Sequence, residues 1–240
     1  MAVYLRDLSA RAPIAADLPA VKELFAICAR VEGELEGHEE DGDLSASWQR
    51  IDFQLSSDAW LILTRQGLVV GYGAVWPVNG DGAEAPQGSR WAFCVRVHPA
   101  YRGRGIGTLL LRLVEQRARS ALENVGDRAR GGAFLTTTVA YSNRCARALL
   151  EREGYQLERS LWHIVIESQA QAAWSERPYL TLKLELEEEE HAASAPKSPA
   201  RLLTPTGRTM VRHYCCYEKP LLPGGPPLEK TEPGDASRCL

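Results

Sequence analysis

A segment near the middle of the chain constrains the fold more than any other. Residues 95–108 read Val-Arg-Val-His-Pro-Ala-Tyr-Arg-Gly-Arg-Gly-Ile-Gly-Thr. We expect a strand that ends at Pro99 and an amphipathic helix that begins at Ile106, because leucine or valine follows Ile106 at +3, +4, +7 and +8. The chain must therefore turn from strand to helix within a few residues rich in glycine and arginine.

This turn has the chemistry of an anion cradle. Glycines allow backbone N–H groups to approach a ligand, and the start of a helix adds the positive end of its dipole. Arginines add fixed charge, and the combination suits a pyrophosphate. The residues concerned are Arg102, Gly103, Arg104, Gly105 and Gly107. The alternative is a glycine-rich turn whose arginines bind nothing.

Common phosphate motifs do not fit the turn. A Walker A motif needs Gly-Lys-Ser/Thr, which is absent here, and the spacing is G-x-G-x-G rather than the G-x-G-x-x-G of dinucleotide-binding folds. The other elements of a protein kinase are also missing.

The flanking sequence predicts helices and strands packed as a partly parallel sheet. We expect a helix over 18–31 capped by Asp17, a helix over 44–55, and a hairpin of strands 59–64 and 68–76 around Gln66-Gly67. Further strands are expected at 91–97, 133–139 and 156–167. A helix over 143–152 should end at Gly154.

The amino-acid composition of the chain changes after Glu187. We divide it into a main domain (1–187), an acidic and Ala/Pro-rich linker or insertion (188–208), and a final strand with a Pro-rich tail (209–240). Leucines alternate with polar residues over 180–186, and residues 209–218 are also strand-like. We expect one or both of these strands at the edge of the sheet, where the first offers a homodimer contact.

Composition excludes several classes of protein. The 240 residues carry a net charge of −3, which is no nucleic-acid footprint. Arg6 and Asp7 interrupt any signal peptide and no apolar run reaches the ~18 residues of a membrane span, so we expect a cytoplasmic protein. The six cysteines lack metal-ligand spacing, and we predict free thiols and no metal.

Two segments resemble the GNAT superfamily of N-acyltransferases. Arg102, Gly105 and Gly107 match its acetyl-CoA-binding signature R/Q-x-x-G-x-G/A, and residues 143–155 resemble its N-x-x-A-x-x-x-Y-x-x-x-G-F segment. The resemblance covers residues 2–167. It implies an α/β (α+β) fold with a mixed, mostly antiparallel central sheet flanked by helices, here followed by a Pro-rich C-terminal extension.

The resemblance also implies an activity. The protein would be an acetyltransferase that moves the acetyl group of acetyl-CoA to a primary amine of a small molecule or peptide, by direct attack in a ternary complex. Val95, Arg96 and Val97 would hold the pantetheine, with the Val95 N–H as the oxyanion donor. The pyrophosphate would lie on Arg102, Gly103, Arg104, Gly105, Ile106, Gly107 and Thr108, with Asn143 and Ala146 on the other wall.

The sequence departs from the family at both groups that usually transfer protons. Leu150 stands where many members have a tyrosine acid, and Phe93 and Cys94 occupy the neighbourhood of the usual glutamate. Tyr141 and Tyr155 are candidate replacements for the acid. Residues 32–43 contain seven acids and no Lys or Arg, which suggests a cationic amine acceptor or a solvated loop. Within that segment the candidate bases are Glu34, Glu36 and Glu39.

Two other functions compete with the enzyme. The missing proton-transfer groups are consistent with an acyl-CoA-binding regulatory module that has no turnover. A nucleotide-binding protein could also use the Arg-Gly turn for phosphates, in which case ATP should compete better than CoA.

Overall fold

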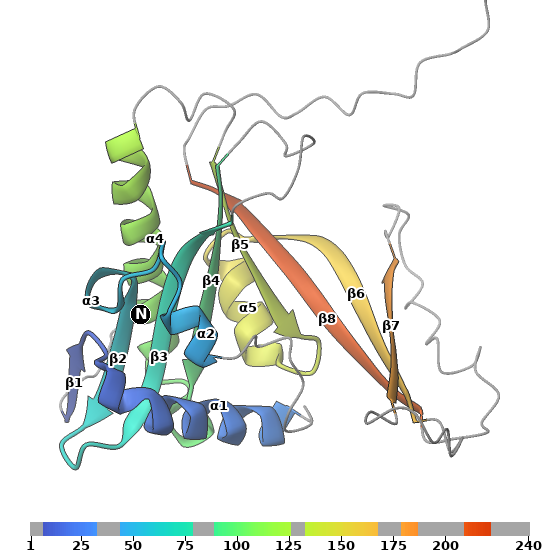
Figure 1. The fold of residues 1–240 in the computed structure, drawn as a ribbon, viewed down its shortest axis with the longest axis horizontal. Coiled ribbons are helices and arrows are strands. Elements are labelled where there is room, and N and C mark those ends of the chain that lie inside the picture. Colours follow the sequence, from blue (N-terminus) through green and yellow to red (C-terminus); the bar gives the residue numbers. More distant parts are fainter. Residues whose placement is uncertain are drawn as a thin grey trace, which may run out of the picture.

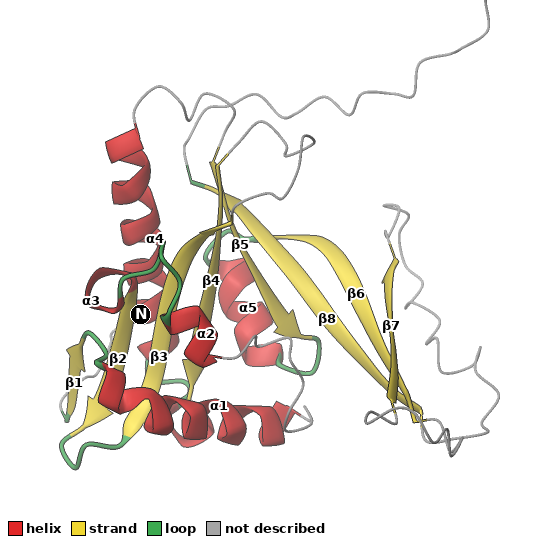
Figure 2. Ribbon diagram, in the orientation of Figure 1, coloured by secondary structure: helices red, strands yellow, loops and turns green. Residues whose placement is uncertain are grey.

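The computed structural model describes residues 7–32, 44–78, 89–125, 133–167, 179–186 and 209–221. They form an eight-stranded sheet in the order β1-β2-β3-β4-β5-β8-β6-β7 (Figures 1 and 2). The strands are β1 (Leu8–Arg11), β2 (Ala59–Thr64), β3 (Val69–Val78), β4 (Ser89–Val97), β5 (Ala133–Ala140), β6 (Gln156–Glu167), β7 (Tyr179–Leu186) and β8 (Thr209–Pro220). The helices are α1 (Leu18–Glu32), α2 (Leu44–Trp48), α3 (Leu55–Asp58), α4 (Ile106–Val125) and α5 (Arg144–Arg152).

The sheet is mixed and mostly antiparallel, as the resemblance to the GNAT superfamily implied. Among the described strands, only β4 and β5 pair in parallel, and α4 is the crossover between them. The expected hairpin is present, and Gly67 takes a φ of 83° in its turn. No helix among the residues described is long and apolar enough to cross a membrane.

Helices cover the two faces of the sheet unequally. On one face, α1 packs Val21, Leu24 and Cys28 against β2 and β3. On the other face, α4 and α5 cover the middle of the sheet and β8, burying residues such as Leu111 and Leu150 (Figure 1). As a result, the α1 face of β5, β8 and β6 is free of any described helix.

Two predicted details were wrong. The expected helix over 44–55 is two short helices, because Gln54 N–H donates to the Asp58 carboxylate at 2.7 Å and a new helix begins at Leu55. Asp17 does not cap α1. Its carboxylate accepts from the backbone N–H of Ile14 at 2.8 Å, and so closes a short 3-10 turn before the helix.

The strand at 209–220 lies inside the sheet rather than at its edge. β8 pairs with β5 on one side and β6 on the other, while β7 forms the edge. The division at 187/188 stays a prediction, since residues 187–208 and 222–240 fall outside the described chain.

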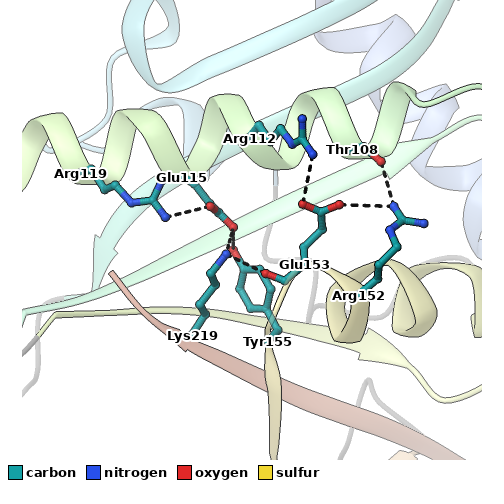
Figure 3. A network of polar contacts seen from close by, with 8 residues as sticks. All are labelled: Thr108, Arg112, Glu115, Arg119, Arg152, Glu153, Tyr155 and Lys219. Carbon is teal, nitrogen blue, oxygen red and sulfur yellow. Dashed lines mark hydrogen bonds and ion pairs between the residues drawn. The ribbon is translucent and has the colours of Figure 1, made fainter. Parts of the chain in front are cut away.

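A polar network fastens β8 and the turn after α5 to α4 (Figure 3). The buried Glu115 carboxylate accepts from Lys219 Nζ at 2.8 Å, from Arg119 Nη2 at 3.0 Å and from the Tyr155 hydroxyl at 3.1 Å. Lys219 also donates to the Glu153 carbonyl at 2.7 Å. β8, the last strand in the sequence, is therefore bonded to α4, the helix that follows the glycine-rich turn.

Candidate functional site

The sheet opens between β4 and β5. The two strands pair over Ser89–Ala92 and Ala133–Thr136, and beyond these rows they diverge (Figure 1). Just past the last pair, the buried Thr137 hydroxyl donates to the Phe93 carbonyl at 2.9 Å. The result is a V-shaped gap whose narrow end lies at Ala92 and Thr136.

Backbone groups of β4 point into this gap. In an antiparallel pair, alternate residues direct their N–H and C=O groups to the same side of the strand. His98 N–H donates to Val70 on β3, whereas the Phe93 and Val97 carbonyls bond on the opposite side, to Thr137 and Arg102. Val95 lies midway between Phe93 and Val97, so its N–H and C=O face the gap.

The glycine-rich turn closes the wide end of the gap. Gly103 and Gly105 have φ values of 77° and 86°, a region that favours glycine. The Gly105 carbonyl accepts from Leu109 N–H at 3.0 Å, so α4 begins at Ile106 and the first N–H groups of the helix lack helical partners. A Cβ on Gly107 would lie 3.1 Å from Leu149 Cδ2, so a side chain there would crowd α5.

A cavity of about 270 Å³ joins the gap, the turn and α5. The predicted cofactor residues come together in its wall, with one exception. Those lining it are Val95, Arg96, Val97, Arg102, Gly103, Gly105, Ile106, Gly107, Thr108, Asn143 and Ala146. The exception is Arg104, whose guanidinium lies 4.8 Å from the centre of the Tyr101 ring and whose side chain lines a different depression.

Glu32 bridges the mouth of the cavity, and sequence analysis did not single it out. Its carboxylate accepts from Arg102 Nη2 at 2.6 Å and from Asn143 Nδ2 at 2.7 Å, with 4% of the side chain exposed. Its backbone carbonyl accepts from the Ser142 hydroxyl at 2.9 Å. The end of α1 is thus tied to both sides of the gap. The one local signal was the position of Glu32 at the start of the acidic segment 32–43.

Arg102 and Asn143 are held by further bonds. Arg102 Nε donates to the Val97 carbonyl at 3.2 Å, and Asn143 Oδ1 accepts from Ala146 N–H at 3.0 Å as the N-cap of α5. Both side chains are therefore fixed in place before any ligand is considered, which makes the cavity a preformed site.

The sequence model of the acetyltransferase (GNAT) family matches residues 18–155 of this chain. That is more than half of the 240 residues. The chain belongs to the GNAT family of acetyltransferases.

One solved structure shows the same fold, and a second has lower similarity. A GCN5-related N-acetyltransferase from Sphaerobacter thermophilus superposes with a TM-score of 0.64 at 16% identity, covering 90% of this chain and 96% of that one. The structure of yncA, a putative acetyltransferase from Salmonella typhimurium described with its cofactor acetyl-CoA, gives 0.46 at 19% identity and covers 79% and 99%. A comparison with curated proteins gave no significant match.

The position that carries a tyrosine in many GNAT proteins is buried in this chain and does not line the cavity. Leu150 is 4% exposed and lies in the core between α4, α5 and the sheet, while its neighbour Leu149 lines the cavity. Tyr155 is also internal. Burial and the nearby Glu115 raise the pKa of its hydroxyl, which donates to Glu115 and keeps its proton.

Tyr141, a proton-transfer candidate among the described residues, does not line the cavity. Tyr141 is stacked between the Arg147 guanidinium, 4.2 Å from its centroid, and the His213 ring at 4.3 Å, and His213 stacks in turn on Trp162. This column fastens the end of β5 to β8 and β6. Glu34, Glu36 and Glu39 lie outside the described residues.

Proposed function

We propose that this GNAT protein transfers the acetyl group of acetyl-CoA to a primary amine by direct attack in a ternary complex. The observation that carries the proposal is the cavity in which a glycine-rich helix start meets the unpaired side of β4. Both features are needed for acetyl-CoA, because the turn suits a pyrophosphate and the strand edge suits the amides of pantetheine.

The direction of the bound molecule follows from these two contacts. The pyrophosphate lies on the N–H groups at the start of α4, beside Arg102, and the pantetheine runs back along β4 toward the narrow end of the gap. From Val97 to Ala92 the strand spans about 17 Å. The thioester, at the end of coenzyme A farthest from the pyrophosphate, therefore lies toward Val95 and Phe93.

The Val95 N–H is the proposed oxyanion donor, since it faces the gap where the thioester carbonyl would lie. The amine must approach from the α1 face. The opposite face is closed by α4 and α5, where the side chains of Val95 and Val97 pack against buried core residues. The acidic segment 32–43 supports a cationic acceptor, but Glu32 itself is neutralised by Arg102 and adds no attraction.

The first test is calorimetric titration of acetyl-CoA into the wild-type protein and two glycine variants. Gly105→Glu places a carboxylate in the cradle and should abolish binding. Gly67→Glu is the matched control, because Gly67 also has a positive φ but lies in the exposed β2–β3 turn. Tight binding that only Gly105→Glu removes supports the proposal, and a folded wild-type protein that binds neither acetyl-CoA nor CoA refutes it.

Turnover separates the enzyme from a binding module. Release of the CoA thiol is followed with spermidine, L-lysine and an alanine tripeptide as acceptors, each against a reaction without amine. Amine-dependent release supports the acetyltransferase. Tight binding of acetyl-CoA without any release supports the regulatory module.

A further inference from the structure

The α1 face of the sheet, from which the acceptor must approach, carries a carboxylate beside the narrow end of the gap. Strand alternation assigns the faces. The Arg96 guanidinium lies 5.3 Å from the centre of the Phe25 ring on α1, so Arg90 on the same strand shares that face. On β8, Tyr217 and Lys219 reach Glu151 of α5 and Glu115 of α4 on the opposite face. Glu218, between them, therefore points to the acceptor side.

The register places Glu218 level with the point where the sheet opens. Ala92 pairs with Thr136, which is the last row before the gap, and Thr136 pairs with Glu218 on its other side. Two strand spacings amount to about 10 Å between backbones. The Arg90 side chain crosses this distance, because its Nη2 lies 3.6 Å from Glu218 Oε2 on β8 and 3.7 Å from Glu158 Oε1 on β6. Glu218 therefore lies on the acceptor face, in the row at which the sheet opens and two strands from β4.

The surroundings of Glu218 suit a carboxylate that exchanges a proton. Glu218 is 16% exposed, and its buried Oε2 has no hydrogen-bond donor within the part of the chain that the structure describes. The charged groups that face it are Arg90 of β4 and Glu158 and Arg159 of β6. Burial raises the pKa of the Glu218 carboxyl and the charges of Arg90 and Arg159 lower it. The negative charge of Glu158 and a hydrogen bond between the Glu158 and Glu218 side chains raise it. A raised pKa makes a carboxylate a stronger base near neutral pH.

We propose that Glu218 is the general base that deprotonates the acceptor amine. The inference rests on the proposed acetyltransferase function and names a catalytic group on β8, outside the two sequence motifs. The ammonium nitrogen of the acceptor loses two protons in the reaction. Glu218 takes one and passes it to solvent, the neutral nitrogen forms a bond to the thioester carbonyl carbon, the C–S bond breaks, and the second proton ends on the CoA thiol.

The test is a pH profile of kcat for CoA release, with whichever of spermidine, L-lysine and alanine tripeptide the wild-type enzyme acetylates fastest. Glu218→Gln should lower kcat by 10²-fold or more. Its Tm and its Kd for acetyl-CoA should match those of the wild type. Glu123→Gln, an exposed glutamate on α4, serves as the matched control and should leave the profile unchanged.

Variants of two residues next to Glu218 should move the acidic limb of the pH profile in opposite directions. Glu158→Gln removes a charge that raises the pKa of Glu218, so the acidic limb of the profile should move to lower pH. Arg90→Gln removes a charge that lowers it, and the limb should move to higher pH. A structural role for the cluster would lower the Tm without moving the limb in opposite directions.

The outcomes separate this inference from the function on which it rests. If the wild type turns over and Glu218→Gln keeps its kcat, Glu218 is not the base and the acetyltransferase stands. If both neighbouring variants leave the limb in place, the inference is likewise overturned. If the wild type acetylates none of the three amines, the proposed function itself fails and Glu218 loses its role with it.

Discussion

The buried network around Glu115 makes a quantitative prediction about how β8 is held in the sheet. Glu115→Ala removes an 8% exposed carboxylate that accepts from Lys219 at 2.8 Å, Arg119 at 3.0 Å and the Tyr155 hydroxyl at 3.1 Å. Removing one partner of a buried ion pair costs roughly 3–5 kcal/mol. Lys219 keeps its bond to the Glu153 carbonyl and is 21% exposed, so the lower end applies.

We therefore expect Glu115→Ala to lower the free energy of unfolding by about 3 kcal/mol, which for a chain of this size is a fall in Tm of about 6–12 °C. Urea unfolding followed by tryptophan fluorescence measures the loss. Glu123→Ala, an exposed glutamate on the same helix, is the control and should change stability by less than about 0.5 kcal/mol.

A double-mutant cycle with Lys219→Met separates the ion pair from the packing of the glutamate stem. Once Glu115 is gone, loss of Lys219 should cost less, giving a coupling energy above about 1 kcal/mol. A loss below about 1 kcal/mol for Glu115→Ala, or strictly additive single variants, would refute the reasoning that the network anchors β8.

Three further predictions concern the cavity and the first helix. Gly105→Ala should fold with a loss of about 1–2 kcal/mol because of its positive φ, and its Kd for acetyl-CoA in calorimetry should rise. Asn143→Ala removes the cap of α5 and a donor to Glu32, and we expect a loss of about 1 kcal/mol in urea unfolding that Asn143→Asp only partly restores. Arg11 lowers the pKa of Asp17, so the wild-type protein should exceed Asp17→Asn in stability at neutral pH, and urea midpoints should converge as pH falls below about 4.

Local patterns were sufficient to predict most elements of the sheet. Apolar runs separated by a turn marked β2 and β3, β-branched residues marked β5, and Asn143 and Gly154 marked the ends of α5. The helix predicted over 44–55 failed for a tertiary reason. Ile51, which stands at helical spacing from Leu44 and Trp48, is fully exposed, whereas Phe53 is buried. A helical spacing of apolar residues does not predict which of these side chains will be buried in the core.

The glycine-rich turn was readable because its chemistry is local. The glycines and the start of α4 are neighbours in sequence, so their common purpose can be inferred without knowing the fold. The directions of the two arginines could not be inferred in this way. Arg102 turns toward the Val97 carbonyl and Glu32, while Arg104 turns toward Tyr101, and this difference depends on contacts made by α1.

Sequence analysis did not identify Glu32 and Glu218 as site residues, because their partners in the structure lie on elements that are distant in the sequence. Glu32 meets residues that lie 70 and 111 positions further along the chain. Glu218 faces Arg90 only because β8 enters the sheet between β5 and β6, although β6 and β7 precede it in the sequence. No motif spacing encodes such an insertion. The sequence motifs therefore locate the proposed cofactor half of the site, while the proposed acceptor half depends on strand order.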